Sequence, residues 1–238
     1  MRARTIALGM LLFLAATPAT AQVEQLLRGP RGLAPQSGLS EGEIASGLKD
    51  ALQVGTQNAV NLTAKTDGYF GNQAIKILMP AKLRALESGL RAIGYGPKVD
   101  EFVLSMNRAA ERAAPAATQI FWEAIGSMSF EDARKIWSGG DTAATEYFRA
   151  KTSDALGNAF RPVVEKATNE VGVTRQFKDL MGRFRAIPFA RVESLDVDQY
   201  VVGKALDGLF YILGEEEKKI RTNPVARTTD LLKEVFGK

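Results

Sequence analysis

The sequence predicts an all-α fold: a multi-helix, bundle-like single domain with at most one short β-hairpin near residues 69–79. Apolar residues recur three and four positions apart along most of the chain, which is the spacing of an amphipathic helix face. Proline, glycine and capping residues interrupt this pattern where helices start and stop. The 238 residues, 45% of them hydrophobic and 24% charged, suit one large domain or two small ones.

Residues 1–21 have the three parts of an export signal: two early arginines, an apolar run over residues 5–16, and small residues at 19–21. The run of about 12 apolar residues is shorter than the roughly 20 that a membrane-spanning helix needs. No cysteine follows the small residues, so a lipid anchor is not expected either. We therefore expect cleavage after Ala21 and a soluble periplasmic protein, with no transmembrane anchor in the mature chain.

Residues 22–38 are rich in glycine and proline, which predicts a flexible leader before a single all-α domain over residues 39–238. Ser40–Glu43 is a capping box, in which the serine and glutamate side chains satisfy amides at a helix start. The apolar periodicity that follows predicts a first helix ending near Thr66.

The middle of the chain alternates turn residues with helical patterns. Asp67–Asn72 has the composition of a turn, and Ile75–Met79 is a short apolar, β-like run. Pro80 ends that run and is expected at the first position of the next helix. Pro97 starts another helix, which Pro115 should kink or restart before residue 128.

Further helices are expected in the second half of the chain. Ser129–Asp132 is a second capping box, Asp141 is expected to cap the following helix, and Pro162 is expected to restart it. A helix around residues 177–184 should precede a linker at 186–195, where the domain has a possible subdomain break.

The helix after this linker carries a wide apolar stripe that includes Val202, Leu206 and Leu209. Such a helix is expected to be deeply buried, so the C-terminal part should complete the same core. Asn223–Pro224 predicts a turn, and residues 231–236 predict a last amphipathic helix.

The composition excludes several kinds of site. Without histidine or cysteine the chain has no Ser-His-Asp triad, no disulfide, and none of the usual ligands of zinc, haem or iron–sulfur clusters. We expect no cofactor and no metal. Removing the two arginines of the export signal lowers the formal net charge from +4 to +2, so a nucleic-acid partner is not expected.

Five sequence runs resemble a bacterial family known as domain of unknown function number 4197. They are Thr66–Asn72, Met106–Glu111 with Pro115, Gly139–Arg149, Lys204–Phe210 and Asn223–Leu232. Together they extend over nearly all of the chain from Ser40 to Gly237. The resemblance implies an exported, helical bacterial protein, with some relatives lipid-anchored. It implies no activity and no catalytic residues.

Asn107, Arg108 and Glu111 form the first polar cluster, with Trp122 and Glu123 placed near it if the chain bends at Pro115. Arginine can hold a carboxylate or phosphate with two parallel hydrogen bonds. The same long side chains can instead tie two helices together, and we expect this structural role to be the commoner one.

Lys204 and Asp207 lie between Tyr200 and Tyr211 on one face of the helix that follows the linker. A buried lysine, acid and phenol could transfer protons, whereas an exposed Lys204–Asp207 pair would be an ordinary surface feature. Because exposed pairs of this kind are common, we favour the surface feature.

Three further residues are candidates for ligand contact. Tyr69 and Phe70 could form an aromatic binding lip, although turn formation is the more common use of such a sequence. Arg227 beside a helix start could hold an anion, or the segment could simply cap the helix.

Three function classes fit these residues. The leading one is a non-catalytic, envelope-associated protein that binds an unknown envelope protein or a small amphiphilic ligand. The second is a carboxylate-based hydrolase using Glu111, Glu123 and Asp207, because such chemistry needs neither histidine nor cysteine. The third is a purely structural envelope protein, in which the polar runs serve as caps and ties.

Overall fold

Helices make up most of the chain in the computed structural model, which describes residues 41–170, 196–227 and 233. The all-α prediction is confirmed, and the described residues contain no β-strand. The helices are α2 (Glu41–Ala64), α3 (Arg84–Ala92), α4 (Gly96–Ala113), α5 (Ala117–Gly126), α6 (Phe130–Ser138), α7 (Ala143–Glu170) and α9 (Val197–Thr222).

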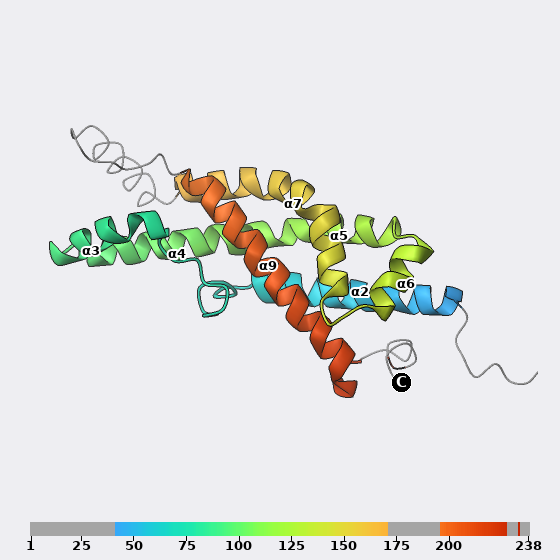
Figure 1. Cartoon of the computed structure of the whole chain (residues 1–238). Helices are drawn as coiled ribbons and strands as arrows, with labels where there is room; N and C mark the ends of the chain where they lie inside the picture. Colours follow the sequence, from blue (N-terminus) through green and yellow to red (C-terminus); the bar gives the residue numbers. More distant parts are fainter. Residues whose placement is uncertain (1–40, 171–195, 228–232, 234–238) are drawn as a thin grey trace, which may run out of the picture. The chain divides into compact units, whose positions relative to one another are not determined.

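Helix α9 is central to the packing because it lies against α7, α2 and α4 (Figure 1). Helix α7 also packs on α4, and α2 contacts α5 and α6. Three buried rings join these layers: Phe121 of α5 meets Phe148 of α7 and Phe210 of α9 edge to face, with centroids 5.2 and 6.2 Å apart. Such pairs add stability beyond the area they bury. The apolar stripe predicted for α9 is therefore part of the common core.

Prolines end or continue helices according to what surrounds them. Pro115 lies in a 3-10 turn between α4 and α5, so the predicted restart is confirmed. Pro80 precedes a 3-10 turn, Ala81–Leu83, and is its N-cap rather than the first helical residue. The restart predicted at Pro162 is wrong, because α7 runs through it without a break. Phe160 and Val164 are fully buried on either side, and this packing holds the helix together across the proline.

Two helix starts show how caps are supplied. The capping box at α6 is confirmed: Ser129 Oγ accepts from the Asp132 amide at 3.1 Å, and the Ser129 amide donates to the Asp132 carboxylate at 3.2 Å. The Ser129 hydroxyl also donates to the Asp132 carboxylate at 2.7 Å, and this bond together with the amide bond lowers the pKa of Asp132. At α7 the expected cap by Asp141 is replaced, because Glu217 of α9 accepts from the Ala144 and Thr145 amides.

The segment between α2 and α3 is a turn followed by extended chain. Asp67 has a φ of 63°, and a Cβ on Gly68 would lie 2.6 Å from the carbonyl oxygens of Leu62 and Thr63. Glycine is therefore required for the chain to reverse at this point. The predicted turn is confirmed, whereas the β-hairpin that the sequence allowed near residues 69–79 does not form.

Several predictions concern residues outside the described ranges. They are the export signal at 1–21, the leader at 22–38, the capping box at Ser40, the helix around 177–184, the linker at 186–195 and the last helix at 231–236. In the part of the chain that the structure describes, no helix has the length and hydrophobicity needed to cross a membrane.

Candidate functional site

The segment over residues 65–80 is fixed to the helices by buried polar side chains, beginning with Tyr69. Its ring is completely buried, and its hydroxyl donates to the carbonyl oxygen of Ala205 in α9 at 2.6 Å. Burial raises the pKa of the Tyr69 phenol far above its ordinary range, and the nearby Glu111 carboxylate raises it further. Gly208 leaves the space for this ring, since a Cβ there would lie 2.6 Å from Tyr69 Cε1.

Asn107 holds the extended part of the same segment. This α4 side chain is fully buried and accepts from the Ile77 amide at 2.8 Å. Its amide group donates to the carbonyl oxygens of Ile77 and Val103, both at 2.8 Å. One asparagine side chain thus pairs with Ile77 as a neighbouring β-strand would, which explains why a β-like run needs no second strand.

Glu111 fixes the turn from one helical turn further along α4. Its carboxylate accepts from the Tyr69 amide at 3.1 Å and the Phe70 amide at 3.2 Å. Arg108 donates to the same carboxylate at 2.6 Å and to Asp67 at 2.8 Å. Hydrogen bonds to Glu111 and Asp67 raise the pKa of Arg108, although partial burial opposes the rise. The structure therefore brings together five of the residues that the sequence singled out: Tyr69, Phe70, Asn107, Arg108 and Glu111.

The other candidate residues lie elsewhere. Lys204 and Asp207 form an exposed ion pair of 2.9 Å, and Asp207 also lies 3.8 Å from Arg149. Trp122 is 45% exposed on α5 and is not among the contacts of the α4 cluster. Arg227 donates to the carbonyl oxygens of Ile220 and Arg221 at the end of α9.

A second polar network surrounds Glu217. The i,i+4 spacing of Glu217 and Arg221 predicts a solvated surface pair, and this prediction is wrong, because only 8% and 11% of these side chains are exposed. Its carboxylate accepts from the Ala144 and Thr145 amides at 2.9 and 2.8 Å, and Arg221 donates to it at 2.9 Å. Arg221 also reaches the carbonyl oxygen of Ile136 at 2.7 Å. Because the amides lie at the start of α7, the carboxylate also meets the positive end of that helix dipole. Glu217 and Arg221 thus tie three helices together.

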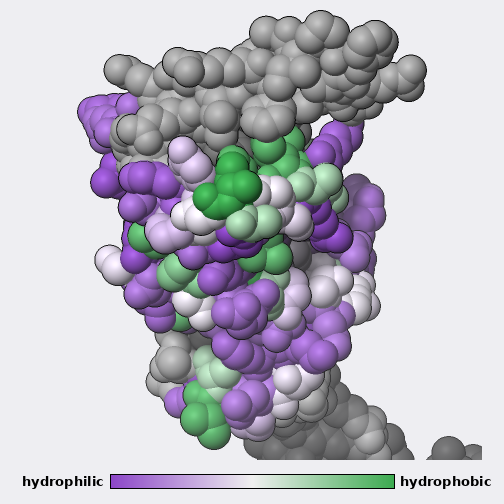
Figure 2. All heavy atoms as spheres, turned by 90° about the vertical axis from the view of Figure 1, so that its left-hand side faces the viewer, coloured by the Kyte–Doolittle hydropathy of each residue, from purple (hydrophilic) through white to green (hydrophobic). Residues whose placement is uncertain are grey.

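A hollow of about 530 Å³ opens beside the fixed segment, between it and the α3–α4 pair. We call it the α3–α4 hollow. Its lining combines apolar side chains with charged ones: Phe70, Lys76, Leu78, Met79, Arg84, Glu87, Ser88, Arg91, Asp100 and Val103. Figure 2 faces the end of the molecule where α3 lies and shows hydrophobic residues as separate spots within a mainly hydrophilic surface.

The charges in this hollow are unevenly matched. Arg91 pairs with Glu87 at 3.0 Å and with Asp100 at 2.8 Å, and these hydrogen bonds raise its pKa. Both acidic residues of the lining are thus ion-paired with one arginine, Arg91. Lys76 lies with its ammonium 4.0 Å from the centre of the Phe70 ring. Among the described residues, neither Lys76 nor Arg84 has a carboxylate partner.

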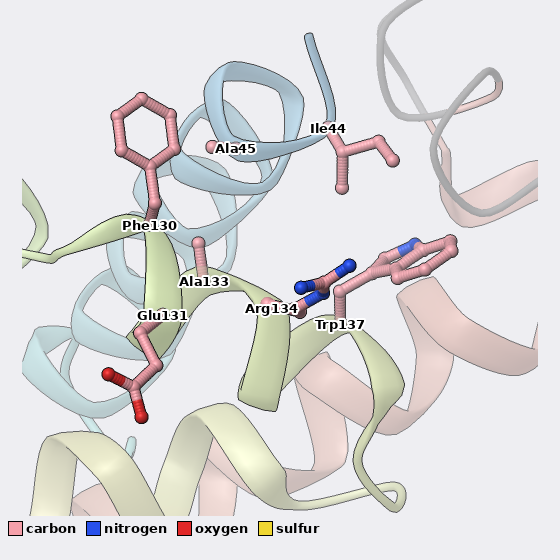
Figure 3. Close-up of a pocket in the computed structure, with 7 residues that line it drawn as sticks. All are labelled: Ile44, Ala45, Phe130, Glu131, Ala133, Arg134 and Trp137. Carbon is pink, nitrogen blue, oxygen red and sulfur yellow. The ribbon is translucent and has the colours of Figure 1, made fainter. Parts of the chain in front are cut away.

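A second hollow of about 260 Å³ lies between α2 and α6. Figure 3 shows Ile44 and Ala45 of α2 facing Phe130 and Trp137, which lie at opposite ends of α6. Phe130 is 70% exposed and also lines a neighbouring hollow of about 240 Å³. We call the hollow of about 260 Å³ the α2–α6 hollow. Its lining contains one arginine, Arg134, and one glutamate, Glu131, which pairs with Lys135 at 2.7 Å.

Sequence reasoning identified Phe70 but missed Lys76 and Arg84. Each is a basic residue near a turn or helix start, which is ordinary in a sequence. They are distinguished by having no carboxylate partner among the described residues, and this depends on contacts across the fold because Arg91 engages both acids of the lining.

The fold and this site define an all-α helical protein in which buried polar ties hold a turn segment beside an open, partly apolar hollow. The chain belongs to the family described as "Protein of unknown function (DUF4197)", whose model matches residues 38–237. No curated protein and no solved structure matches the chain. The described residues contain no group of acidic side chains arranged to hold a metal ion.

Proposed function

We propose that this is an exported, periplasmic protein that binds a small ligand without catalysis, and that the α3–α4 hollow is its binding site. The observation that carries the proposal is the composition of this hollow. Apolar side chains line it together with two cations, Lys76 and Arg84, that have no carboxylate partner within the described ranges. Its volume of about 530 Å³ falls within the range of small-molecule sites.

The fixed segment supports this proposal because it presents Phe70, Lys76 and Leu78 to the hollow. Asn107 and Glu111 hold the backbone of this segment through buried hydrogen bonds. A site held in place before binding loses less conformational freedom when its ligand arrives. The polar cluster on α4 therefore serves the site by positioning it.

The geometry gives little support to a carboxylate-based hydrolase. Glu111 is buried and engaged by two backbone amides and Arg108. Glu123 accepts from Gln119 on the surface of α5, and Asp207 pairs with Lys204 on α9. A glycosidase needs two acids that face one cleft, and none of these three acids lines the hollows described above.

Export is supported by residues 1–21, whose arginines, apolar run and small residues match a cleaved signal. N-terminal sequencing of the protein from the periplasmic fraction should begin at Gln22. Intact Met1 in that fraction would overturn this half of the proposal.

Native mass spectrometry of the protein purified from periplasm tests the binding half. The experiment compares Ser88→Trp, which fills the hollow from an exposed position on α3, with Ala85→Trp, which adds the same side chain outside the lining. We expect a small molecule to accompany the wild type and Ala85→Trp but to be lost from Ser88→Trp. A ligand-free wild type, or equal retention by both variants, would contradict the proposal and favour a purely structural role.

A further inference from the structure

We propose that the ligand of the α3–α4 hollow is an anionic amphiphile, with a carboxylate or phosphate held by Arg84 and Lys76 and an apolar chain lying on Phe70, Leu78 and Met79. This inference rests on the proposed function and adds the chemical class of the ligand to it. It also assigns binding roles to two residues that neither the sequence patterns nor the family indicates.

The charge of the lining favours an anion. It contains three cationic and two acidic side chains, and both acids are bound to Arg91. An incoming anion therefore meets Lys76 and Arg84 without displacing an existing ion pair. A cationic ligand would face these two groups and find Glu87 and Asp100 already engaged.

Arg84 can hold the anionic group through its side chain. It is the first residue of α3 and is exposed, and its backbone amide is already bonded to the carbonyl oxygen of Ala81 in the preceding 3-10 turn. The guanidinium therefore supplies the attraction, because arginine can bind a carboxylate or phosphate through two parallel hydrogen bonds.

The apolar part of the lining favours a ligand that has an apolar chain as well as an anionic group. Leu78 is 58% exposed, and Phe70 is half-buried beside it. Such exposed side chains gain from contact with an alkyl chain, because each methylene removed from water contributes to binding. The hydrophobic residues of Figure 2 form separate spots, so this face offers small apolar contacts and lacks the broad patch that marks many protein interfaces.

Isothermal titration with three twelve-carbon probes tests the class of ligand. Dodecyl phosphate below its micelle concentration supplies the anion, dodecyl maltoside the neutral control, and dodecyltrimethylammonium the cationic control. We expect the wild type to bind dodecyl phosphate at least roughly tenfold more tightly than either control. Equal affinity for the three probes, or a preference for the neutral or cationic one, would overturn the inference.

Matched charge variants then locate the anion. Arg84→Gln and Lys76→Gln should each weaken binding of dodecyl phosphate by roughly tenfold. Arg161→Gln removes an exposed arginine of α7 outside the hollow and should leave the affinity unchanged. An equal loss in Arg161→Gln would show that only net charge matters and would contradict the assigned site. Circular dichroism checks that every variant folds.

The acidic group could belong to a free amphiphile or to a lipid in a bilayer. Binding of monomeric dodecyl phosphate identifies the first. Co-sedimentation with phosphatidylglycerol vesicles, lost in Arg84→Gln and unaccompanied by binding of the monomeric probe, identifies the second. Both results support the shared chemistry, and failure of both contradicts it.

The two proposals fail in different ways. If a neutral or cationic molecule accompanies the native protein and is lost from Ser88→Trp, the hollow is a binding site but the assigned ligand class is wrong. If nothing accompanies the native protein and it binds neither the probes nor the vesicles, the proposed function itself is wrong.

Discussion

Replacing Gly208 by alanine tests the close packing on which the segment over residues 65–80 depends. Gly208 lies in α9, where a Cβ would be 2.6 Å from Tyr69 Cε1 and 3.1 Å from the Cβ of Ile75. The Tyr69 ring is completely buried and its hydroxyl is bound to Ala205, so the ring cannot simply turn away. We expect Gly208→Ala to move the segment.

The expected magnitude combines opposing effects. Alanine gains about 1 kcal/mol over glycine inside a helix. Overpacking a filled core costs about 1–3 kcal/mol, and a displaced Tyr69 would weaken its hydrogen bond by about 1 kcal/mol. The net result is a loss of about 1–3 kcal/mol. Gly203 offers a matched control on the same helix, because a Cβ there meets no atom within 4 Å. Gly203→Ala should therefore stabilise the protein by up to about 1 kcal/mol.

Urea unfolding followed by circular dichroism measures both variants, and an unchanged slope against urea would show that the denatured states are comparable. We expect the two alanine variants to differ by about 2–4 kcal/mol, because the helix gain is common to both and the packing and hydrogen-bond costs fall on Gly208→Ala alone. In a Tyr69→Leu background, which removes the ring, this difference should largely disappear because the two sites are coupled. A Gly208→Ala protein as stable as Gly203→Ala would refute the packing argument.

Three further predictions concern the buried polar contacts. Asn107→Ala should lower the free energy of unfolding by about 3 kcal/mol, because the amide and carbonyl of Ile77 lose buried partners. Hydrogen exchange should show faster exchange of the Ile77 amide, and unchanged protection would contradict this. Tyr69→Phe should cost about 1–2 kcal/mol at neutral pH. Above the ordinary tyrosine pKa of 10.0, the unfolded wild type ionises at Tyr69, while the buried phenol has a raised pKa and stays protonated. The free energy of unfolding of the wild type therefore falls by about 1.4 kcal/mol per pH unit relative to the Phe variant. A gap between wild type and Phe variant that stays constant through alkaline pH in urea titrations would refute this. Glu217→Gln should cost about 3 kcal/mol by breaking a buried ion pair, and a loss that vanishes in high salt would instead indicate an exposed contact.

The parts of the fold that the sequence predicts correctly depend on short stretches of chain. The capping box at Ser129 and the break at Pro115 each involve neighbouring residues, so the local pattern is sufficient. Pro162 shows where this reasoning fails. Its cost to the helix is local, but the packing that outweighs it comes from α4 and α9, which the sequence alone does not place beside α7.

In the candidate site, too, the sequence predicts what depends on neighbouring residues and does not predict what depends on contacts across the fold. Asn107, Arg108 and Glu111 can be identified as one polar cluster from the sequence because they lie within about one helical turn of each other on α4. Their partners are 30 to 42 residues away in the chain, at Ile77 and in the turn beginning at Asp67, and no local pattern identifies them. The cap that Glu217 provides reaches across 72 and 73 residues to α7 and was missed for the same reason.

Stability and ligand binding should be linked in this protein, because the residues that hold the segment fix the positions of the neighbouring residues that line the hollow. Asn107 fixes the backbone at Ile77, which separates Lys76 from Leu78, and both neighbours face the hollow. Glu111 fixes Phe70 in the same way. A ligand that binds only the ordered segment would stabilise it by mass action. Under the proposed function, the cluster that the sequence offers as a ligand clamp or a helix tie acts on binding through the geometry of its neighbours.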